Sequence, residues 1–551
     1  MKIYEAVANA FVAEGVDTHF CLLGDGNLHW GIAMESHRGM RTFHARHEHC
    51  AVAMAAGYAS ATGNVGVASV TCGPGFTQLM TALASAARDR SPLVVFAGES
   101  PMHSRWWIQE IDQPPLATAS GAHYIAMHSP QLVHYHVQEA FRIAKQDRKP
   151  VVIGLPYDFQ NQELPAIAPY ETSASIIPDL GPIQPDPVQI GRVAAKLQRA
   201  KCPLIIGGRG VLASHAETDV ERLAEISGAL LGTTLPARGT FDHTPFSLGV
   251  MGGYARMIAR EFAQKADLVV AFGASLSAFT QVGGKMFANA EVIQIDTNPV
   301  GRRQGLKIAD FYVRADAALA ARALLDRLGN GENVQSQVRT PDLARRIREE
   351  PADDGVFPAQ AGTVDPRELF KELERLIPGD FDAIGGSGHQ AYFHTVMRGY
   401  DPRKYHHLRD FGAIGNALSH AVGVAAARGN NGKVVLYEGD GSLLMHIQEL
   451  ECIKRHGLKL LMVVCNDGAY GAELHHLRKE GVDGSIVVFG RPDLAAIARG
   501  FGLQGAVVTD VRQLADLARD YERSDTAAVW DVHINDQVVN PSYRLGNKHA
   551  N

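Results

Sequence analysis

The residues best suited to chemistry lie at the ends of two apolar runs in the last third of the chain. The first run ends in GDGS (439–442) and the second in NDG (466–468), with 27 positions separating Asp440 from Asp467. Two oxygen side chains on neighbouring strand ends can bind a hard divalent cation, and glycines at a helix start can accommodate phosphate. Either glycine-rich segment alone would usually be a turn. The two together predict a cation and phosphate site.

The stretch between these strand ends must position them. Its apolar residues recur at helical spacing and predict one helix: Leu443, Leu444, Ile447, Leu450 and Ile453. A strand–helix–strand unit brings both strand ends to one edge of a parallel sheet, where α/β proteins bind ligands.

Three such blocks follow one another along the chain, at 1–160, 188–328 and 365–551. In each, short apolar runs alternate with helical stretches, which predicts an α/β fold with a mostly parallel sheet flanked by helices. Seven prolines between positions 156 and 187 predict a linker after the first block, and a polar stretch (329–366) separates the other two.

The paired strand ends resemble the thiamine diphosphate (ThDP) signature of the acetolactate synthase and pyruvate decarboxylase superfamily, in which GDG precedes an Asn pair. The three blocks match its pyrimidine-binding, middle and diphosphate-binding domains in order, so the resemblance covers the whole chain. It implies ThDP and Mg²⁺ as cofactors. It also implies a homodimer or homotetramer with active sites at the subunit interface.

By this resemblance Asp440 and Asp467 bind Mg²⁺ through their side chains and Ala469 binds it through its carbonyl. The family usually has Asn at position 467, and Asp remains a hard oxygen ligand that adds negative charge. Ile414 is expected under the bent cofactor. The other residues implied to contact ThDP are Thr71, Gly73, Gln78, Gly388, His389, Gln390, Gly412, Gly439, Gly441, Ser442, Tyr470 and Gly471.

Glu48 is implied as the acid that activates the cofactor. Residues 44–59 (HARHEHCAVAMAAGYA) resemble the family's Arg-His-Glu segment before an Ala-rich helix. Protonating N1′ of the aminopyrimidine makes its exocyclic amine acidic enough to remove the thiazolium C2 proton. One alternative is an exposed helix acid. Another is a metal site at His44, His47 and His49, although His47 and His49 would face different sides of a helix.

The expected pocket combines features of two reaction types. Residues 23–28 (LGDGNL) resemble a decarboxylase loop that places Asp25 over the thiazolium, and Glu473 stands where those enzymes have a second catalytic acid. Their His-His pair is not found near 103–113, where Gln109 instead matches the substrate-facing Gln of acetolactate synthases. As alternatives, Asp25 is a helix cap, Glu473 a solvated acid and Gln109 a loop hydrogen bonder.

These features predict an acetolactate-synthase-like carboligase acting on a 2-oxo acid or related α-hydroxyketone. The first alternative is a non-oxidative 2-oxo acid decarboxylase. The second is a catalytically silent ThDP-binding protein, which the presence of Glu48 disfavours. A dinucleotide-dependent dehydrogenase is disfavoured because no GxGxxG opens a helix in the right place.

FAD is admitted as a further cofactor but is not favoured. Acetolactate synthases hold it in the middle domain, partly through an Arg after the Gly-Ala of a strand end, and residues 272–276 read FGASL instead. The cluster GGRG (207–210) could approach a nucleotide phosphate, but a lone glycine cluster is weak evidence.

Composition and charge exclude several other classes. The 53 basic and 59 acidic residues are interspersed and give a net charge of −6, which argues against nucleic acid as a partner. No apolar run approaches the roughly 18–20 residues of a membrane helix. The six cysteines lack metal-finger spacing, and the acid-containing N-terminus does not read as a signal peptide. Reduced thiols in a cytoplasmic enzyme are therefore expected.

Overall fold

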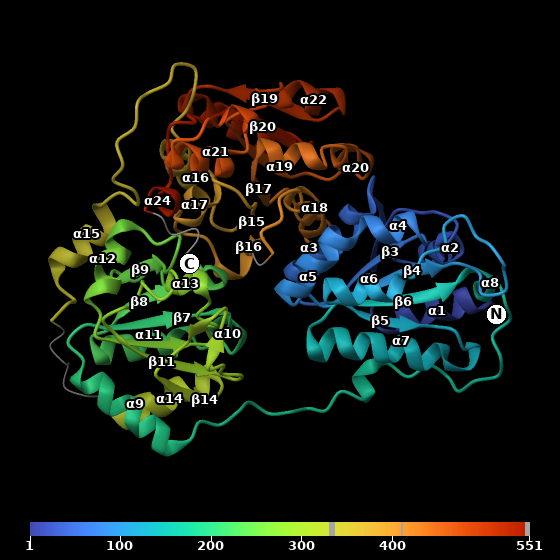
Figure 1. The fold of residues 1–551 in the computed structure, drawn as a ribbon, viewed down its shortest axis with the longest axis horizontal. Coiled ribbons are helices and arrows are strands. Elements are labelled where there is room, and N and C mark those ends of the chain that lie inside the picture. The colour runs from blue at the N-terminus through green and yellow to red at the C-terminus, as the bar shows by residue number, and fades with distance from the viewer. Residues whose placement is uncertain (330–336, 409–410, 546–551) are drawn as a thin grey trace.

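The computed structural model describes residues 1–551 except 330–336, 409–410 and 546–551. It contains three six-stranded sheets whose strands are all parallel, each flanked by helices (Figure 1). The central strands of each sheet are buried on both faces, as parallel sheets covered by helices require. The predicted α/β fold class is confirmed.

The first sheet has the order β2-β1-β3-β4-β6-β5. Its strands are β1 (Thr18–Cys21), β2 (Arg41–His44), β3 (Gly66–Val70), β4 (Leu93–Glu99), β5 (His123–Ala126) and β6 (Val151–Pro156). Its helices are α1 (Ile3–Ala13), α2 (Leu28–Ser36), α3 (Glu48–Thr62), α4 (Pro74–Gln78), α5 (Met80–Asp89), α6 (Gln113–Ser120), α7 (Val133–Arg142) and α8 (Tyr157–Gln160).

The middle sheet has the order β14-β11-β10-β7-β8-β9. Its strands are β7 (Pro203–Gly207), β8 (Leu230–Thr233), β9 (Ser247–Val250), β10 (Leu268–Phe272), β11 (Glu291–Asp296) and β14 (Phe311–Arg314), and β12 (Arg302–Arg303) and β13 (Leu306–Lys307) form a separate ribbon. Its helices are α9 (Pro187–Arg199), α10 (Arg209–Ala213), α11 (Glu217–Ser227), α12 (Met257–Lys265), α13 (Ala278–Gln281) and α14 (Ala317–Leu328).

The third sheet, β16-β15-β17-β18-β20-β19, repeats the topology of the first. Its strands are β15 (Asp382–Gly385), β16 (Tyr405–His407), β17 (Val434–Gly439), β18 (Leu461–Asn466), β19 (Gln504–Val508) and β20 (Ala528–His533). Helix α15 (Pro341–Glu349) precedes this domain, whose helices are α16 (Pro366–Leu376), α17 (Ala391–Thr395), α18 (Ala417–Ala427), α19 (Asp440–Met445), α20 (Glu449–Arg455), α21 (Gly471–Glu480), α22 (Leu494–Gly500), α23 (Leu514–Arg523) and α24 (Pro541–Arg544).

The single helix expected after GDGS is wrong. The chain instead forms two short helices, α19 and α20, separated by a turn. At that turn His446 leaves helical geometry, with φ −137° and ψ 33°. The break turns the side chains of His446 and Glu449 toward α3, where both are in contact with the first domain.

Helices α3 and α18 join the first and third domains through one shared hydrophobic core. A Cβ at Gly57 would lie 2.1 Å from His420 O, and a Cβ at Gly423 would lie 1.9 Å from Met54 O. The two helix backbones therefore touch at positions that only glycine can occupy. Figure 1 shows α3 and α18 side by side where the two domains meet.

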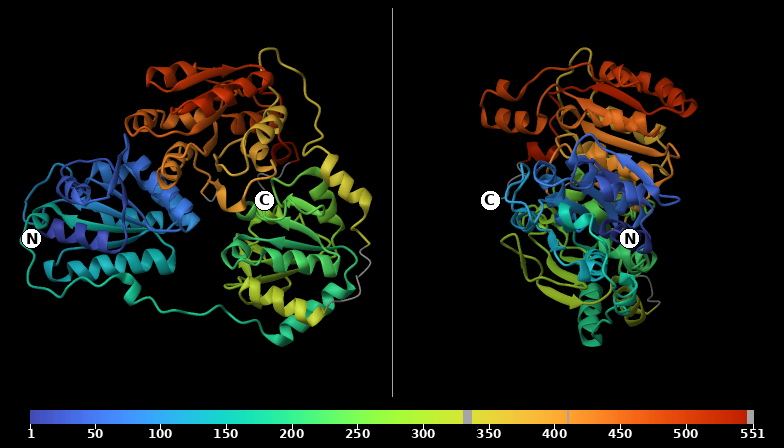
Figure 2. Two further views of the ribbon diagram at one scale, coloured as in Figure 1. Left: turned by 180° about the vertical axis from the view of Figure 1, so that it is seen from behind. Right: turned by 90° about the vertical axis from the view of Figure 1, so that its right-hand side faces the viewer.

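The proline-rich segment after β6 runs as an extended chain from the first domain to the middle domain. Figure 2 shows it along the side away from the third domain. Of the residues that the structure describes, no helix is both long and apolar enough to cross a membrane. All six cysteines are buried and unpaired.

Candidate active site

Strands β17 and β18 bring the two acidic strand ends together. They are parallel neighbours with Gly439 opposite Cys465, so Asp440 and Asp467 follow at the same edge. Gly468 N–H donates to Asp440 Oδ2 (2.8 Å), and Ala469 N–H donates to Asp467 Oδ1 (3.2 Å). The predicted convergence of the two carboxylates is therefore found.

The electrostatics of this pair favour a cation. Burial, and secondly the charge of Asp467, raise the pKa of Asp440, which is 2% exposed. Burial likewise raises the pKa of Asp467. Two carboxylates in a poorly hydrated site resist double ionisation unless a positive charge lies between them. Oxygen ligands of this kind fit Mg²⁺.

The residues that we expect to contact the diphosphate pack closely around the two carboxylates. A Cβ at Gly441 would lie 2.9 Å from Tyr470 Cε1, and one at Gly471 would lie 2.3 Å from Asp467 Oδ2. Gly415 N–H donates to Ser442 Oγ (2.7 Å), which ties the loop before α18 to this edge. Side chains at Gly441 and Gly471 would collide with Tyr470 and Asp467, so glycine at these positions lets the strand ends and the helix starts pack closely together.

The predicted Gly388-His389-Gln390 segment lies at the same edge. A Cβ at Gly439 would lie 3.4 Å from Gln390 Oε1, and Gly388 has φ +138°. His389 is buried, and its Nε2 accepts a hydrogen bond from Asn540 N–H (3.1 Å). The neutral His389 ring therefore carries its proton on Nδ1.

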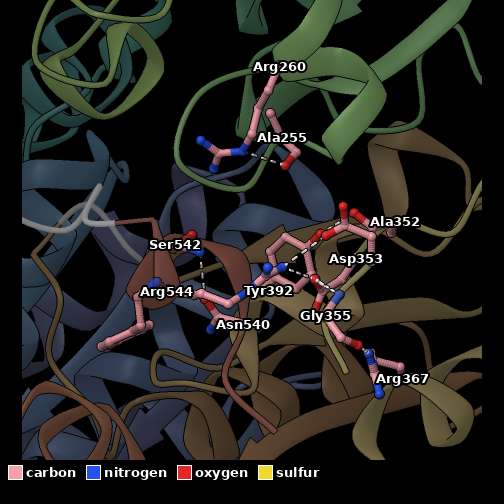
Figure 3. A network of polar contacts seen from close by, with 12 residues as sticks. Ala255, Arg260, Ala352, Asp353, Gly355, Arg367, Tyr392, Asn540, Ser542 and Arg544 are labelled. Carbon is pink, nitrogen blue, oxygen red and sulfur yellow. Dashed lines mark hydrogen bonds and ion pairs between the residues drawn. The ribbon is translucent and has the colours of Figure 1, made fainter. Parts of the chain in front are cut away.

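Sequence reasoning missed Asn540, which comes from the end of the chain. Its side-chain amide donates to His389 O (2.8 Å), and its Oδ1 accepts from Ser542 N–H (2.9 Å). Figure 3 shows Asn540, Ser542 and Arg544 against Tyr392 and Asp353, where Arg544 pairs with Asp353. The Asn-Pro pair at the start of α24 predicts a helix cap. The contact of Asn540 with His389 could not be predicted from the sequence.

Sequence reasoning also missed Glu438, the residue before Gly439. It is fully buried, and its Oε2 has no hydrogen-bond partner among the described residues. Burial raises the pKa of Glu438 to about 8. The sequence signal for Glu438 was a single acid that directly follows the apolar run 434–437 and precedes Gly439.

The pyrimidine half of the site gathers at the edge of the first sheet. Glu48 is the first residue of α3, and a Cβ at Gly75 would lie 3.2 Å from Glu48 Oε1 and 2.7 Å from Thr71 Cγ2. Gly73 has φ +58°, and its Cβ would lie 2.1 Å from Gln109 O. Thr71, Gly73, Gln109 and Glu48 therefore surround one glycine-rich turn. Predicted Gln78 ends the following helix and is exposed.

The loop that carries Asp25 lies against this half. Gly26 N–H donates to Thr71 Oγ1 (3.0 Å), and Cys72 Sγ donates to Gln109 Oε1 (3.2 Å). Asp25 itself is exposed, and the residue preceding α2 is Asn27, so Asp25 does not cap that helix. The helix-cap alternative is therefore wrong.

Glu473 is exposed in the first turn of α21. That position fits both a second catalytic acid and a solvated acid, so its role stays a prediction. Predicted Gly412 and Ile414 lie in the loop before α18, where Gly412 has φ +73° and Ile414 is half-buried.

The elements that carry the two halves meet at the start of α3. The His49 ring stacks on the His446 ring with centroids 4.6 Å apart, and Arg46 N–H donates to Glu449 Oε1 (2.9 Å). Asn416 Nδ2 donates to Ser85 Oγ (3.1 Å). First-domain and third-domain residues beside the site are thus in direct contact.

The alternative metal site at His44, His47 and His49 is wrong, because these three side chains do not converge. His44 turns away, because its N–H donates to His456 Nε2 (3.0 Å) and its Nδ1 lies 3.5 Å from Cys21 Sγ. His47 and His49 have ring centroids 6.2 Å apart in an edge arrangement.

The glycine cluster of the middle domain serves strand packing. Gly208 N–H donates to Phe272 O (2.8 Å) and Gly210 N–H donates to Gly273 O (3.0 Å). Ser275, at the position where the resemblance leads one to expect Arg in an FAD-binding domain, is exposed. These contacts pack the glycines of the cluster against the end of β10.

Family models match all three domains of the chain. The N-terminal TPP binding domain of the thiamine pyrophosphate enzymes matches residues 1–116, the central domain matches 190–324, and the C-terminal TPP binding domain matches 385–532. The chain belongs to the thiamine pyrophosphate enzymes. The predicted family and the predicted ThDP and Mg²⁺ are confirmed.

Acetolactate synthases are similar to this thiamine pyrophosphate enzyme over nearly its whole length. The acetolactate synthase large subunit of Parasynechococcus marenigrum is 30% identical, covering 96% of this chain and 87% of that protein. That of Cyanidium caldarium is 28% identical, covering 89% and 84%. A probable one from Methanocaldococcus jannaschii is 26% identical, covering 100% and 95%. The chain is therefore acetolactate-synthase-like, as predicted.

Proposed function

We propose that this ThDP-dependent enzyme decarboxylates a 2-oxo acid and ligates the remaining acyl unit to a second carbonyl compound. The observation that carries the proposal is the position of Gln109, whose backbone packs on Gly73 beside Glu48 and Thr71. The segment that matches acetolactate synthases therefore borders the pyrimidine half. Relatives named acetolactate synthase across nearly the full chain support the same reaction.

When bound, ThDP would provide the nucleophilic carbon and the electron sink that decarboxylation of a 2-oxo acid requires. Glu48 holds a proton at N1′ of the aminopyrimidine. Its place at the start of α3, packed against Gly75 beside Thr71, supports this role because these residues form the turn of the pyrimidine half. Asp440, Asp467 and the Ala469 carbonyl hold Mg²⁺, and His389 and Gln390 contact the diphosphate.

Gln109 orients the second substrate, while Asp25 and Glu473 control where protons go. An acid that protonates the reacting carbon ends the cycle as an aldehyde, so proton delivery competes with ligation. The non-oxidative decarboxylase remains the second candidate. It is favoured by the loop of Asp25, which Thr71 holds beside the pyrimidine half.

We also propose a homodimer or homotetramer in which two subunits complete each site. Large apolar side chains are exposed beside both halves: Trp106 (71%) and Ile108 (79%) near Gln109, and Tyr470 (43%), Ile486 (87%) and Phe489 (42%) near the diphosphate edge. Exposed apolar surface of this kind is typical of protein interfaces. Six unpaired cysteines support a cytoplasmic location.

The test is incubation of the ThDP- and Mg²⁺-loaded enzyme with a panel of 2-oxo acids, each with and without an aldehyde or 2-oxo acid acceptor. Evolved CO₂ and ligated product are quantified together. We expect ligated product to account for most of the CO₂ released from the best substrate. Aldehyde in place of ligated product would support the decarboxylase, and no CO₂ from any substrate would overturn both.

A further inference from the structure

Three potential metal ligands converge where the first and third domains meet. The ligand atoms of His47, Cys50 and His446 all lie within 4.8 Å of one another. His47 precedes α3 and Cys50 lies in its first turn, while His446 stands at the break between α19 and α20. The cluster is therefore assembled from both domains, by a helix break that the apolar spacing did not predict.

The donor set suits a transition metal rather than Mg²⁺. It offers one thiol sulfur and two imidazole nitrogens, a combination typical of zinc sites, whereas Mg²⁺ prefers oxygen ligands. Cys50 is fully buried and His446 is 8% exposed, so an ion there would be shielded from water. Cys50, His446 and His47 are not among the residues assigned to ThDP or Mg²⁺.

A buried carboxylate lies next to the cluster. Glu449 is fully buried, and its Oε1 accepts the Arg46 N–H. Its Oε2 has no hydrogen-bond partner in the part of the chain that the structure describes. The carboxyl group interacts with the Cys50 thiol. Glu449 lies outside the set of ligand atoms that converge within 4.8 Å, so its carboxylate acts as a neighbour of the Cys50 ligand and not as a ligand itself.

We propose that His47, Cys50 and His446 bind a zinc-class divalent ion, with Glu449 as a buried neighbour of the Cys50 ligand. The ion would clip α3 to the turn after α19 and so hold the two cofactor-binding domains together. Binding releases the Cys50 thiol proton to solvent, because the thiolate is the ligand. This inference does not rest on the proposed reaction, since it uses a separate donor set.

Metal binding has a structural signature at His47. Its Nδ1 accepts the His49 N–H (3.1 Å), a bond that caps α3. Coordination through either ring nitrogen displaces this bond, because the neutral ring carries its proton on the nitrogen that does not bind the metal. The His49 amide should therefore exchange with solvent at a different rate in metal-loaded and metal-stripped protein.

The first experiment measures first-row transition metals in the full-length protein by mass spectrometry after dialysis without chelator. We expect about one zinc-class ion per chain, in addition to Mg²⁺. The stripped protein is then titrated with Co²⁺. Tetrahedral coordination with a thiolate ligand gives intense visible and near-ultraviolet absorption, and this readout is independent of enzymatic activity. A wild-type protein without bound metal and without these bands would overturn the proposal.

Variants locate the ion. Cys50→Ser and His446→Ala should each weaken Co²⁺ binding by more than about 100-fold, which exceeds the usual loss for an outer-sphere partner. Cys202→Ser is the matched control, because Cys202 is also a buried free thiol but lies in the middle domain. Unchanged Co²⁺ spectra in Cys50→Ser and His446→Ala would place the ion elsewhere and overturn the assignment.

Discussion

Asp467 makes the cation site of this chain more negative than an Asp–Asn pair would. Burial raises the pKa of both Asp440 and Asp467, and the charge of Asp467 is the second cause for Asp440. A bound Mg²⁺ relieves this repulsion, so the cation and the two carboxylates stabilise one another. The diphosphate is then held largely through the ion.

Removing one carboxylate should therefore cost cofactor binding. We predict that Asp440→Ala loses Mg²⁺-dependent ThDP retention and weakens ThDP affinity by at least tenfold, or about 1.4 kcal/mol. Isothermal titration with and without Mg²⁺ measures this. The control is Asp467→Asn, which keeps an oxygen ligand and should keep Mg²⁺-dependent binding. Unchanged ThDP affinity in Asp440→Ala would remove Asp440 from the ligand set.

Glu48 should matter for turnover and not for cofactor binding. Glu48→Gln preserves the shape and packing against Gly75 but cannot exchange a proton with N1′. We predict normal ThDP affinity and a fall in kcat of about 10²–10⁴-fold, the usual range for a general acid or base. Steady-state kinetics on the best substrate of the panel provides the measurement. Near wild-type turnover would show that Glu48 does not activate the cofactor.

Glu473 distinguishes protonation from ligation. If its carboxyl faces the reacting carbon, Glu473→Gln removes a proton donor and leaves that carbon available to an acceptor for longer. We predict that aldehyde release slows more than CO₂ release and that the ligated fraction rises. Chromatography at a fixed acceptor concentration gives the product ratio. Unchanged rates with an unchanged ratio would identify Glu473 as a solvated helix acid.

At the scale of elements, the central strands were predictable because they are continuous apolar runs. The apolar runs that end in GDGS and in NDG became β17 and β18. Strands β2 and β5 are the two edge strands of the first sheet and carry half-exposed or exposed residues, so their sequences lack that signal. The break between α19 and α20 also escaped prediction, because apolar spacing continues across it.

The candidate site likewise contains residues that the local sequence pattern predicts and residues that it does not. Asp440 and Asp467 were predictable because a strand–helix–strand unit brings its ends together. Asn540 was not, because its contact with His389 joins positions 151 residues apart. Local pattern carries no information about such a contact. The contacts of His446 could not be predicted either, because they depend on the break between α19 and α20 and on the packing of α3 against that break.

The crossing of α3 and α18 should make the protein sensitive to acid. His420 on α18 is buried at this crossing, and burial lowers its pKa to about 3. Because the unfolded chain titrates near 6.5, it binds this proton below that pH while the folded protein does not. The neutral His420 ring therefore costs the folded protein no stability above about pH 6.5. Below that pH the free energy of unfolding falls by about 1.4 kcal/mol per pH unit because of this residue.

We predict that His420→Asn flattens the pH dependence of stability between pH 6.5 and 5. The slope of the unfolding free energy against pH should fall by about 1.4 kcal/mol per pH unit, which corresponds to the uptake of one proton on unfolding. This change in slope does not depend on the absolute stability of the variant. Urea unfolding at several pH values measures the slope. His123→Asn at an exposed position of β5 is the control and should leave the slope unchanged. An equal slope in His420→Asn and wild type would contradict the assignment.

At the scale of the whole molecule, the shared core fixes two domains within one chain, whereas the exposed apolar surfaces indicate contact with a second chain. The first and third domains are fixed to each other through α3 and α18 within one chain. Yet apolar side chains beside Gln109 and beside Tyr470 remain exposed in that chain. A partner subunit that covers both surfaces would place the pyrimidine half of one chain against the diphosphate half of the other. Asp25 and Glu473 would then reach one pocket from two chains.

Complementation between two inactive variants tests this arrangement. If sites form between chains, a mixed dimer of Glu48→Gln and Asp440→Ala contains one site with both residues intact and one site with neither. Random assembly of equal amounts should then restore about one quarter of the wild-type sites. If each site forms within one chain, every site retains one defect and no activity returns. The measurement is ligated product from co-expressed chains, compared with each variant alone and with variants mixed after assembly. Activity in the co-expressed sample alone requires that the two residues act across the subunit interface.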